Sequence, residues 1–401
     1  MTEVVRSGQW WFNHCGAASG NPVPEAEGSK VVEFQRKFAQ YHGCQFGIAC
    51  ANGTAALEVA LKALGIQPGD EVICPPYTFV ATANAVLQVN GIPVFVDIDP
   101  DTYNIDPTKI EAAVTPRTKG IIPVHFGGQP ADMATILKIA EKRGLFVLED
   151  AAHAHGGKWR DKFCGSIGHA GTFSFQASKN MTAGEGGMVI TNDRTLAERI
   201  ESLVWCGRKH GHPWYEFFEL GWNYRLTEFQ AAILLCQLER LEEQTARRDE
   251  NAQYLSRLLN AIPGIRPIER APDTTIHTQH VYMIRYDSAG FGGLPRDLFL
   301  KALHAEGIPA IAGYTFSLFD NPMYREQRFW NSNFPIQSTQ NPRPMDYHDY
   351  RKSCVVSERA CKGEAVWLAQ SIFLGTRQDM DDIASAFRKI HAYAGELALR
   401  T

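Results

Sequence analysis

Short apolar runs alternate with longer amphipathic segments along the first half of the chain, from about residue 46 to residue 191. The apolar runs have the length of buried strands, and the segments between them repeat apolar residues at helical spacing. This alternation predicts an α/β domain with a mostly parallel sheet, whose ligands gather at the carboxyl ends of the strands. The predicted strands are 46–50, 71–74, 93–96, 120–124, 145–148 and 188–191, and the predicted helices are 55–64, 80–89 and 133–142.

A strong helix-start signal follows this region. Thr227-Glu-Phe-Gln230 forms a capping box, and leucines continue at helical spacing, so a long helix to about Ala252 is predicted. We expect it to link the large domain to a smaller α+β domain with a strand at 281–286 and helices at 298–306 and 380–394. The stretch 321–349 has no clear period and predicts a long loop, either functional or disordered.

Composition narrows the class of protein. With 401 residues, 44% hydrophobic and 21% charged, the chain has ordinary globular values and room for two or three domains. A formal charge of -4 and the lack of a basic stripe argue against nucleic acid as a partner. No apolar run reaches the roughly 18 residues that span a bilayer. Nine scattered cysteines without a CxxC pair predict reduced thiols in a cytoplasm, and no metal site.

The stretch from Gly171 to Gly187 carries the most chemical information. It places Lys179 between a short β-like segment and a glycine-rich turn, with Ser174 five residues earlier. In a desolvated pocket a lysine loses its proton readily and condenses with an aldehyde, while serine and close-approaching backbone suit a phosphate. Together these residues indicate pyridoxal 5'-phosphate (PLP) as a covalently held cofactor. The alternative is a surface lysine beside an ordinary turn.

A second phosphate signal lies upstream. Asn52-Gly53-Thr54-Ala55 follows a predicted strand and opens a predicted helix. Unpaired amides and the positive end of the helix dipole make such a start a natural phosphate seat. Taken alone, the same residues form only a turn and a helix cap.

An acidic residue ends the apolar run 145–148. A carboxylate at Asp150 needs a partner if it is buried, and a protonated pyridine nitrogen would supply one and would make the ring an electron sink. A helix-capping aspartate is the alternative. His153 is placed to lie against the ring or its phenolic oxygen. A metal role shared with His155 is disfavoured because no third ligand presents itself.

Aromatic and polar residues after other strands are weaker candidates. Tyr77 and Phe79 follow the strand that ends at residue 74, where an aromatic ring can stack on a cofactor, although the sequence alone slightly favours a core position. Asn223 and Arg225 precede the capped helix and offer an amide and a guanidinium, or are simply polar surface residues.

The order of these motifs resembles the DegT/DnrJ/EryC1/StrS family of PLP-dependent sugar aminotransferases, from about residue 8 to residue 394. The motifs are Asn52-Gly-Thr, Glu149-Asp-Ala-Ala-His153-Ala-His155-Gly, Phe173-Ser-Phe-x-x-x-Lys179-x-x-Thr-x-Gly-Glu-Gly-Gly and Gly221-x-Asn223-x-Arg225. The resemblance implies a fold type I transferase. We then expect an N-terminal segment near the active site (1–30), a large domain with a mostly parallel seven-stranded sheet (31–255) and a small α+β domain (256–401).

The resemblance also implies roles for individual residues. Lys179 would carry the cofactor as a Schiff base, Asp150 would pair with the pyridine nitrogen, and Phe79 would stack on the ring. Asn223 would reach the phosphate of a neighbouring subunit, which implies a homodimer with shared active sites. The remaining predicted cofactor contacts are Gly53, Thr54, Ala55, His153, Ser174 and Gln176, and the predicted substrate contacts are Trp10, Trp11, Tyr77, Arg208 and Arg225.

Two subgroups of the family are similar in these motifs: the 3-amino-5-hydroxybenzoate synthases and the glutamine-dependent inosose aminotransferases. We therefore expect a transaminase that moves an amino group from L-glutamate or L-glutamine to a keto-sugar or keto-cyclitol. Two alternatives are a PLP-dependent dehydratase that forms an aromatic product and a catalytically inactive PLP-binding partner of an oxidoreductase. His153 stands where many sugar-specific members carry glutamine.

Overall fold

A seven-stranded sheet forms the centre of the large domain in this computed structural model, which describes residues 1–11, 28–329 and 345–399. The strand order is β1-β9-β8-β5-β4-β2-β3. Only β9 runs against its neighbours β1 and β8, while the remaining pairs are parallel, which confirms the predicted mostly parallel sheet. The strands are β1 (Phe46–Cys50), β2 (Glu71–Cys74), β3 (Ile92–Phe95), β4 (Thr118–Ile121), β5 (Phe146–Asp150), β8 (Ala170–Ser174) and β9 (Gly187–Thr191).

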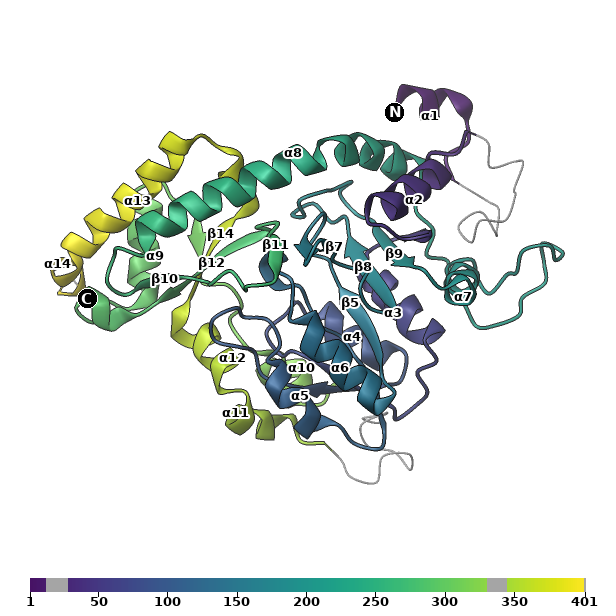
Figure 1. Ribbon diagram of the computed structural model, residues 1–401, viewed down its shortest axis with the longest axis horizontal. Helices are drawn as coiled ribbons and strands as arrows, with labels where there is room; N and C mark the ends of the chain where they lie inside the picture. Colours follow the sequence, from purple (N-terminus) through teal and green to yellow (C-terminus); the bar gives the residue numbers. More distant parts are fainter. Residues whose placement is uncertain (12–27, 330–344, 400–401) are drawn as a thin grey trace.

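Helices cover both faces of this sheet (Figure 1). Successive side chains of a strand point to opposite faces of a sheet, so the residues of β5 alternate between two hydrophobic clusters. Phe146 and Leu148 pack on one side, and Val147 packs on the other with Leu145, which precedes the strand. The first cluster includes residues of α2 (Lys30–Tyr41), α3 (Gly53–Ala63), α4 (Ala81–Gln88) and α7 (Arg194–Val204), and the second those of α5 (Pro107–Ala113) and α6 (Met133–Arg143). A short helix, α1 (Thr2–Ser7), precedes them.

The long helix α8 (Glu228–Leu259) links the two parts of the molecule (Figure 1). Its predicted capping box is present, with Thr227 and Gln230 bonded reciprocally. Leu234 and Leu241 pack into the large-domain core, whereas Leu255 and Leu259 pack into a separate cluster of the C-terminal part. The helix therefore runs past the predicted end at Ala252, because its apolar stripe finds a second core to cover.

The C-terminal part is built on an antiparallel sheet in the order β10-β12-β14-β13. Helix α13 begins at a second capping box, Thr376 with Asp379, slightly before the predicted start. The sheet strands are β10 (Ile265–Pro267), β12 (Val281–Tyr286), β13 (Ala310–Ile311) and β14 (Ala365–Ala369), and the helices are α9 (Arg296–Ala305), α13 (Arg377–Ala392) and α14 (Ala394–Ala398). A three-stranded sheet joins β11 (Thr274–Ile276) to β6 (Lys158–Trp159) and β7 (Lys162–Phe163).

The stretch 321–349 is only partly a loop, and its residues 330–344 lie outside the described residues. Asn321 caps a short helix, α10 (Pro322–Arg325), because its side chain accepts a hydrogen bond from the amide of Met323. Tyr324 and Tyr347 are fully buried and donate hydrogen bonds to Asn84 Oδ1 and Pro93 O of the large domain, both at 3.0 Å. The chain thus returns to the large domain here and continues through α11 (Tyr350–Ser353) and α12 (Val355–Arg359).

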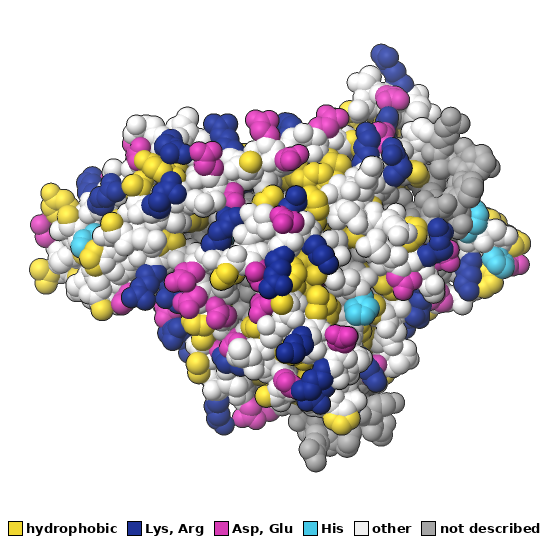
Figure 2. Space-filling view, viewed as in Figure 1, with side chains coloured by type: hydrophobic (Ala, Val, Ile, Leu, Met, Phe, Trp, Pro, Cys, Tyr) yellow, Lys and Arg dark blue, Asp and Glu magenta, His cyan; other side chains and the backbone are white. Residues whose placement is uncertain are grey.

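The surface in Figure 2 intersperses basic and acidic side chains and shows no broad stripe of one sign. Within residues 1–11, 28–329 and 345–399, no helix combines the length and the apolar character that crossing a bilayer requires.

Candidate active site

A cavity of about 600 Å³ opens at the carboxyl ends of the parallel strands. Parallel strands bring these ends to one edge of a sheet, so residues far apart in the chain meet there. The lining comes from the start of α3, the start of α4, the residues that end or follow β5 and β8, and Tyr224 before α8. Among the lining residues are Gly53, Thr54, Ala55, Phe79, Thr82, Asp150, His153, Ser174, Gln176 and Lys179.

The first turn of α3 forms one end of the cavity. Asn52 caps the helix, since its Oδ1 accepts a hydrogen bond from the amide of Ala55 at 2.8 Å. This bond occupies the Ala55 amide and leaves the amides of Gly53 and Thr54 without a partner inside the helix. A Cβ added at Gly53 would lie 2.6 Å from Ser174 Cβ, so only glycine lets the helix start approach the Ser174 hydroxyl. The arrangement is suited to an anion with several oxygens.

Lys179 lies in the turn that follows β8. Gln176 shapes this turn, because its side-chain oxygen accepts hydrogen bonds from the amide and the hydroxyl of Ser178 at 2.8 and 2.7 Å. Burial lowers the pKa of Lys179 to about 8, while the charge of Asp150 acts in the opposite direction. An appreciable fraction of this amine is therefore neutral, and nucleophilic, near neutral pH.

Asp150 ends β5 and is 5% exposed. Its carboxylate accepts hydrogen bonds from Thr82 Oγ1 at 2.8 Å and from the amide of Ala152 at 3.2 Å. Burial raises the pKa of Asp150, and these two hydrogen bonds lower it. No lysine, arginine or histidine of the described residues forms an ion pair with this carboxylate. A cationic ring nitrogen in the cavity would supply the missing partner.

The neighbouring Glu149 points to the other face of β5 and anchors the strand. Its side chain is fully buried and accepts hydrogen bonds from the amides of Gly165, Ile167 and Gly168 at 2.6 to 2.8 Å. The fourth donor is His125 Nε2 at 2.7 Å, because His125 Nδ1 accepts from the amide of Ala131. Glu149 therefore fixes the strand end that carries Asp150. The sequence analysis did not assign this role, although the paired acids offered a signal.

His153 lies on a buried wall of the cavity. Its Nδ1 accepts a hydrogen bond from the amide of Gly127 at 3.3 Å, which leaves the proton on Nε2. Burial holds the pKa of His153 well below its usual range, so the ring is neutral at physiological pH. His280 packs against it with ring centroids 4.3 Å apart. The sequence analysis missed His280, because it comes from the C-terminal part of the chain.

Comparison with known proteins agrees with this geometry. The model of the DegT/DnrJ/EryC1/StrS aminotransferase family matches residues 19–348. The chain belongs to this family. The L-glutamine:2-deoxy-scyllo-inosose aminotransferase of Streptoalloteichus tenebrarius is 39% identical over 409 residues, covering 99% of this chain and 92% of that protein. The 3-amino-5-hydroxybenzoate synthase of Amycolatopsis mediterranei is 37% identical over 383 residues, covering 95% and 91%.

The solved structures agree as well. A crystal structure of 3-amino-5-hydroxybenzoic acid synthase superposes with a TM-score of 0.83 at 35% identity, covering 97% of this chain and 95% of the other. This DegT/DnrJ/EryC1/StrS protein is thus a PLP-dependent aminotransferase of fold type I. The cavity fits the cofactor: it offers free amides beside a serine hydroxyl, a buried carboxylate that forms no ion pair with any described residue, and a lysine of lowered pKa.

In this family member the structure separates the predicted site residues into two groups. Phe79 lines the cavity and is 58% exposed, so its ring is available to stack on a planar ligand. Tyr77 does not line it: the residue is fully buried and packs against Tyr103 and Phe126, so the core position that the sequence left open is the one adopted. Asn223 is exposed and lies outside the cavity lining.

The other predicted substrate contacts form an outer cluster around the loop between α7 and α8. Arg225 stacks over the rings of Trp11 and Trp205, and Arg208 stacks over Trp214. Trp10, at 52% exposure, contacts Phe229 at the start of α8. None of Trp10, Trp11, Arg208 and Arg225 lines the cavity of this chain. In the described part of the chain, no three His, Cys, Asp or Glu residues are arranged to hold a metal.

Gly53→Ala should weaken PLP binding at least about tenfold, because the methyl group would force the start of α3 away from Ser174. The dissociation constant is measured by titrating the apoenzyme with PLP and following visible absorbance. Gly395→Ala is the control, since its added Cβ meets nothing within 4 Å. Ser174→Ala removes the hydroxyl without crowding and should also weaken binding. Unchanged affinity in both Gly53→Ala and Ser174→Ala would place the phosphate elsewhere.

Proposed function

We propose that this enzyme transfers an amino group from L-glutamine or L-glutamate to the ketone of a cyclitol or sugar. One observation carries the proposal. The amine of Lys179, with a pKa lowered to about 8, shares a cavity with buried Asp150 and with the anion-binding residues Gly53, Thr54 and Ser174. Relatives that cover nearly the whole chain are named as L-glutamine:2-deoxy-scyllo-inosose aminotransferases, which supports a glutamine donor and a keto-cyclitol acceptor.

The proposed roles follow from position and charge. Gly53, Thr54 and Ser174 would hold the phosphate by two amides and a hydroxyl, and the hydrogen bond from the Ala55 amide to Asn52 keeps this helix start rigid. Gln176 shapes the turn that presents Lys179, and the exposed ring of Phe79 would cover one face of the pyridine. His153 would offer its Nε2 proton to the phenolic oxygen, because its Nδ1 already accepts a hydrogen bond from the amide of Gly127.

Lys179 and Asp150 divide the proton chemistry between them. When bound, the cofactor supplies an electron sink for the charge that develops at the donor α-carbon. Asp150 would keep the proton on the pyridine nitrogen, since a buried carboxylate with two hydrogen bonds is stabilised further by a cation. Lys179 would act as the neutral base that takes the proton from the donor α-carbon, and the ammonium group so formed would give the proton back later in the transfer.

A second candidate function is a dehydratase that produces an aromatic amine. It is favoured by the relative named as a 3-amino-5-hydroxybenzoate synthase and by the similar crystal structure of such an enzyme. Both candidates use the same lysine, aspartate and phosphate seat. They differ in one respect: the transaminase takes up the amino group of an amino-acid donor, whereas the dehydratase does not.

The deciding experiment incubates the purified holoenzyme with L-glutamine or L-glutamate alone. A transaminase releases one equivalent of keto acid per active site and loses the visible absorbance of lysine-bound cofactor, and a keto-cyclitol then restores it. L-Alanine serves as a donor control. If neither amino acid changes the spectrum while an amino-dehydroquinate-type ring is aromatised, the dehydratase is the function. If no substrate is turned over, the inactive partner protein becomes the better description.

We also propose a homodimer in which each subunit completes the active site of the other, in the cytoplasm, where the eight described cysteines remain free thiols. The loop between α7 and α8 projects from the large domain (Figure 1) and exposes several large apolar side chains. Such a patch on a soluble enzyme favours a protein partner. The exposed residues are Trp214, Tyr215, Phe217, Phe218 and Leu220, and Asn223 follows them.

Mixing two defective variants tests this shared site. Lys179→Ala lacks the lysine, and Asn223→Asp would place a negative charge beside the partner's phosphate. In a mixed dimer, one site receives an intact Lys179 and an intact Asn223 from different subunits. Unfolding and refolding the two variants together should therefore recover about a quarter of wild-type activity. Recovery no greater than that of the separately refolded variants would mean that Asn223 serves its own subunit or none.

A further inference from the structure

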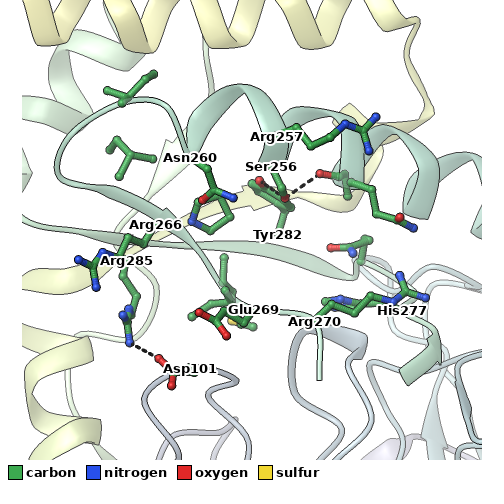
Figure 3. A pocket seen from close by; sticks show the side chains of 18 of the residues that line it. Asp101, Ser256, Arg257, Asn260, Arg266, Glu269, Arg270, His277, Tyr282 and Arg285 are labelled. Atoms are coloured by element: carbon green, nitrogen blue, oxygen red, sulfur yellow. Dashed lines mark hydrogen bonds and ion pairs between the residues drawn. The ribbon is translucent and has the colours of Figure 1, made fainter. Parts of the chain in front are cut away.

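A second large cavity lies outside the active site. It has a volume of about 850 Å³ and is lined by the second half of α8, by β10 and residues 268–270, and by β12 (Figure 3). Asp101 of the large domain closes one edge. We call this cavity the arginine groove, because four arginines line it: Arg257, Arg266, Arg270 and Arg285.

Two of these arginines are directly opposite each other. Arg266 of β10 and Arg285 of β12 are register partners in the antiparallel pair. Like charges in such positions destabilise a sheet unless something of opposite sign lies between them. Arg285 donates hydrogen bonds to Pro100 O at 2.6 Å and Asp101 Oδ1 at 3.0 Å. Arg266 has neither an ion pair nor a side-chain hydrogen bond to any described residue, so its charge is unbalanced.

The remaining charges do not cancel this excess. Arg270 is already paired with Asp249, to which it donates two hydrogen bonds at 2.7 and 2.8 Å. Arg257 lies over the ring of Tyr254 and has no carboxylate partner in the described part of the chain. Among the residues that the structure describes, only two acidic residues, Asp101 and Glu269, line the groove, against four arginines. The wall is therefore positive overall and attracts anions.

A buried imidazole adds an unsatisfied polar group. His277 lines the groove beside Arg270 (Figure 3) and is 6% exposed. Its Nε2 has no hydrogen-bond partner among the described residues. Buried polar atoms are normally paired, so a missing partner at the wall of a cavity indicates a ligand or water position.

The segment that carries His277 also reaches the active site. His277 and Gln279 line the groove, whereas Thr278 and His280 face the other way. Thr278 Oγ1 donates to His153 O at 2.7 Å, and Thr278 O accepts from Asn180 Nδ2 at 2.7 Å. His280 Nδ1 lies 3.2 Å from Asn180 Oδ1. A ligand in the groove would thus touch the segment that positions His153 and the residue next to Lys179.

We propose that the arginine groove binds a small multivalent anion, bearing either a phosphate or at least two carboxylates, and that its occupancy is transmitted to Lys179 through residues 277–280. Guanidinium pairs recognise both kinds of anion through bidentate hydrogen bonds. The volume is large enough for a metabolite as well as for an inorganic ion. The proposal does not depend on the identity of the amino acceptor.

Isothermal titration calorimetry of the PLP-saturated enzyme tests binding, with inorganic pyrophosphate in one arm and citrate in the other. Saturation with PLP keeps the probes from binding at Gly53, Thr54 and Ser174 in the active site. Arg266→Ala and Arg257→Ala should each raise the dissociation constant of the preferred probe at least about tenfold. Arg388→Ala is the matched control, because it removes an exposed arginine from α13, outside the groove. The arm with the higher affinity identifies the class of anion.

The spectrum of the lysine-bound cofactor tests the coupling. Saturating probe should shift the midpoint of its pH titration by at least about 0.3 unit in the wild type and leave it unchanged in Arg266→Ala. Absence of saturable binding up to about 10 mM in both arms would overturn the proposal. Equal weakening by Arg388→Ala would overturn it too, since this indicates general charge attraction. Binding at the arginines without a spectral shift would disprove the coupling to Lys179.

Discussion

Lys179→Ala should lower kcat/KM on the order of 10⁴-fold or more and abolish the visible absorbance of the lysine-bound cofactor. Lys179 is the only lysine that lines the cavity in the described part of the chain, so the variant removes both the covalent attachment and the base for the α-proton. PLP itself should still bind, because the anion seat at Gly53, Thr54 and Ser174 is untouched. Spectral titration with PLP and steady-state kinetics measure the two effects separately.

Lys301→Ala is the control for this variant, since Lys301 is exposed on α9, far along the chain from the cavity residues. The unfolding temperature of the Lys179→Ala apoenzyme should stay close to that of the wild type, because burying a lysine of lowered pKa does not stabilise the fold. Persistence of the lysine-type spectrum after the substitution would show that another lysine holds the cofactor, and the proposed mechanism would then be wrong.

Asp150→Asn should lower kcat on the order of 10²- to 10⁴-fold while PLP binding is partly retained. Loss of the carboxylate removes roughly 1 to 3 pKa units of stabilisation from the protonated pyridine nitrogen. The ring then accepts less of the charge that develops at the donor α-carbon. Rapid-mixing measurements of the donor half-reaction isolate this step from acceptor binding.

The stability of the apoenzyme distinguishes this effect from misfolding. Burial raises the pKa of Asp150, so the folded apoenzyme binds its proton more tightly than the unfolded chain does. Stability from this group therefore decreases as the pH rises above the normal aspartate range, and a neutral asparagine should leave the unfolding temperature unchanged or higher. Asp297→Asn, at an exposed position of α9, is the control. A near-normal kcat in Asp150→Asn would remove the carboxylate from the mechanism.

Several residues that line the cavity could be predicted from the sequence because each belongs to a short local sequence pattern. A strand followed by a capped helix predicts the seat at Gly53, and a lysine after β8 predicts the reactive amine. Parallel strands then force these separate signals to meet at one edge of the sheet, so a correct fold class already implies their proximity. Gly53, Asp150, Ser174 and Lys179 accordingly line one cavity.

Residues whose role depends on packing were less predictable. Tyr77 and Phe79 are two positions apart and equally aromatic, yet one is fully buried and the other is 58% exposed. The hydrogen bonds of Glu149 with His125 and with the amides of residues 165–168 join segments 16 to 24 residues apart, beyond any local pattern. Tyr324 and Tyr347 make an irregular stretch part of the large-domain core through contacts with residues more than 200 positions away.

The amino-acid sequence by itself determined the alternating sheet and the long capped helix and led to the prediction of Lys179 as the reactive lysine, because these depend on hydrophobic period and on the chemistry of single side chains. Only the tertiary structure decided which neighbours those side chains have. The pairing of His153 with His280, the use of the Ala55 amide by Asn52, and the unbalanced charge of Arg266 opposite Arg285 all follow from how distant segments pack. The physical reason is that burial and electrostatic environment are properties of the folded neighbourhood, whereas propensity belongs to the local chain.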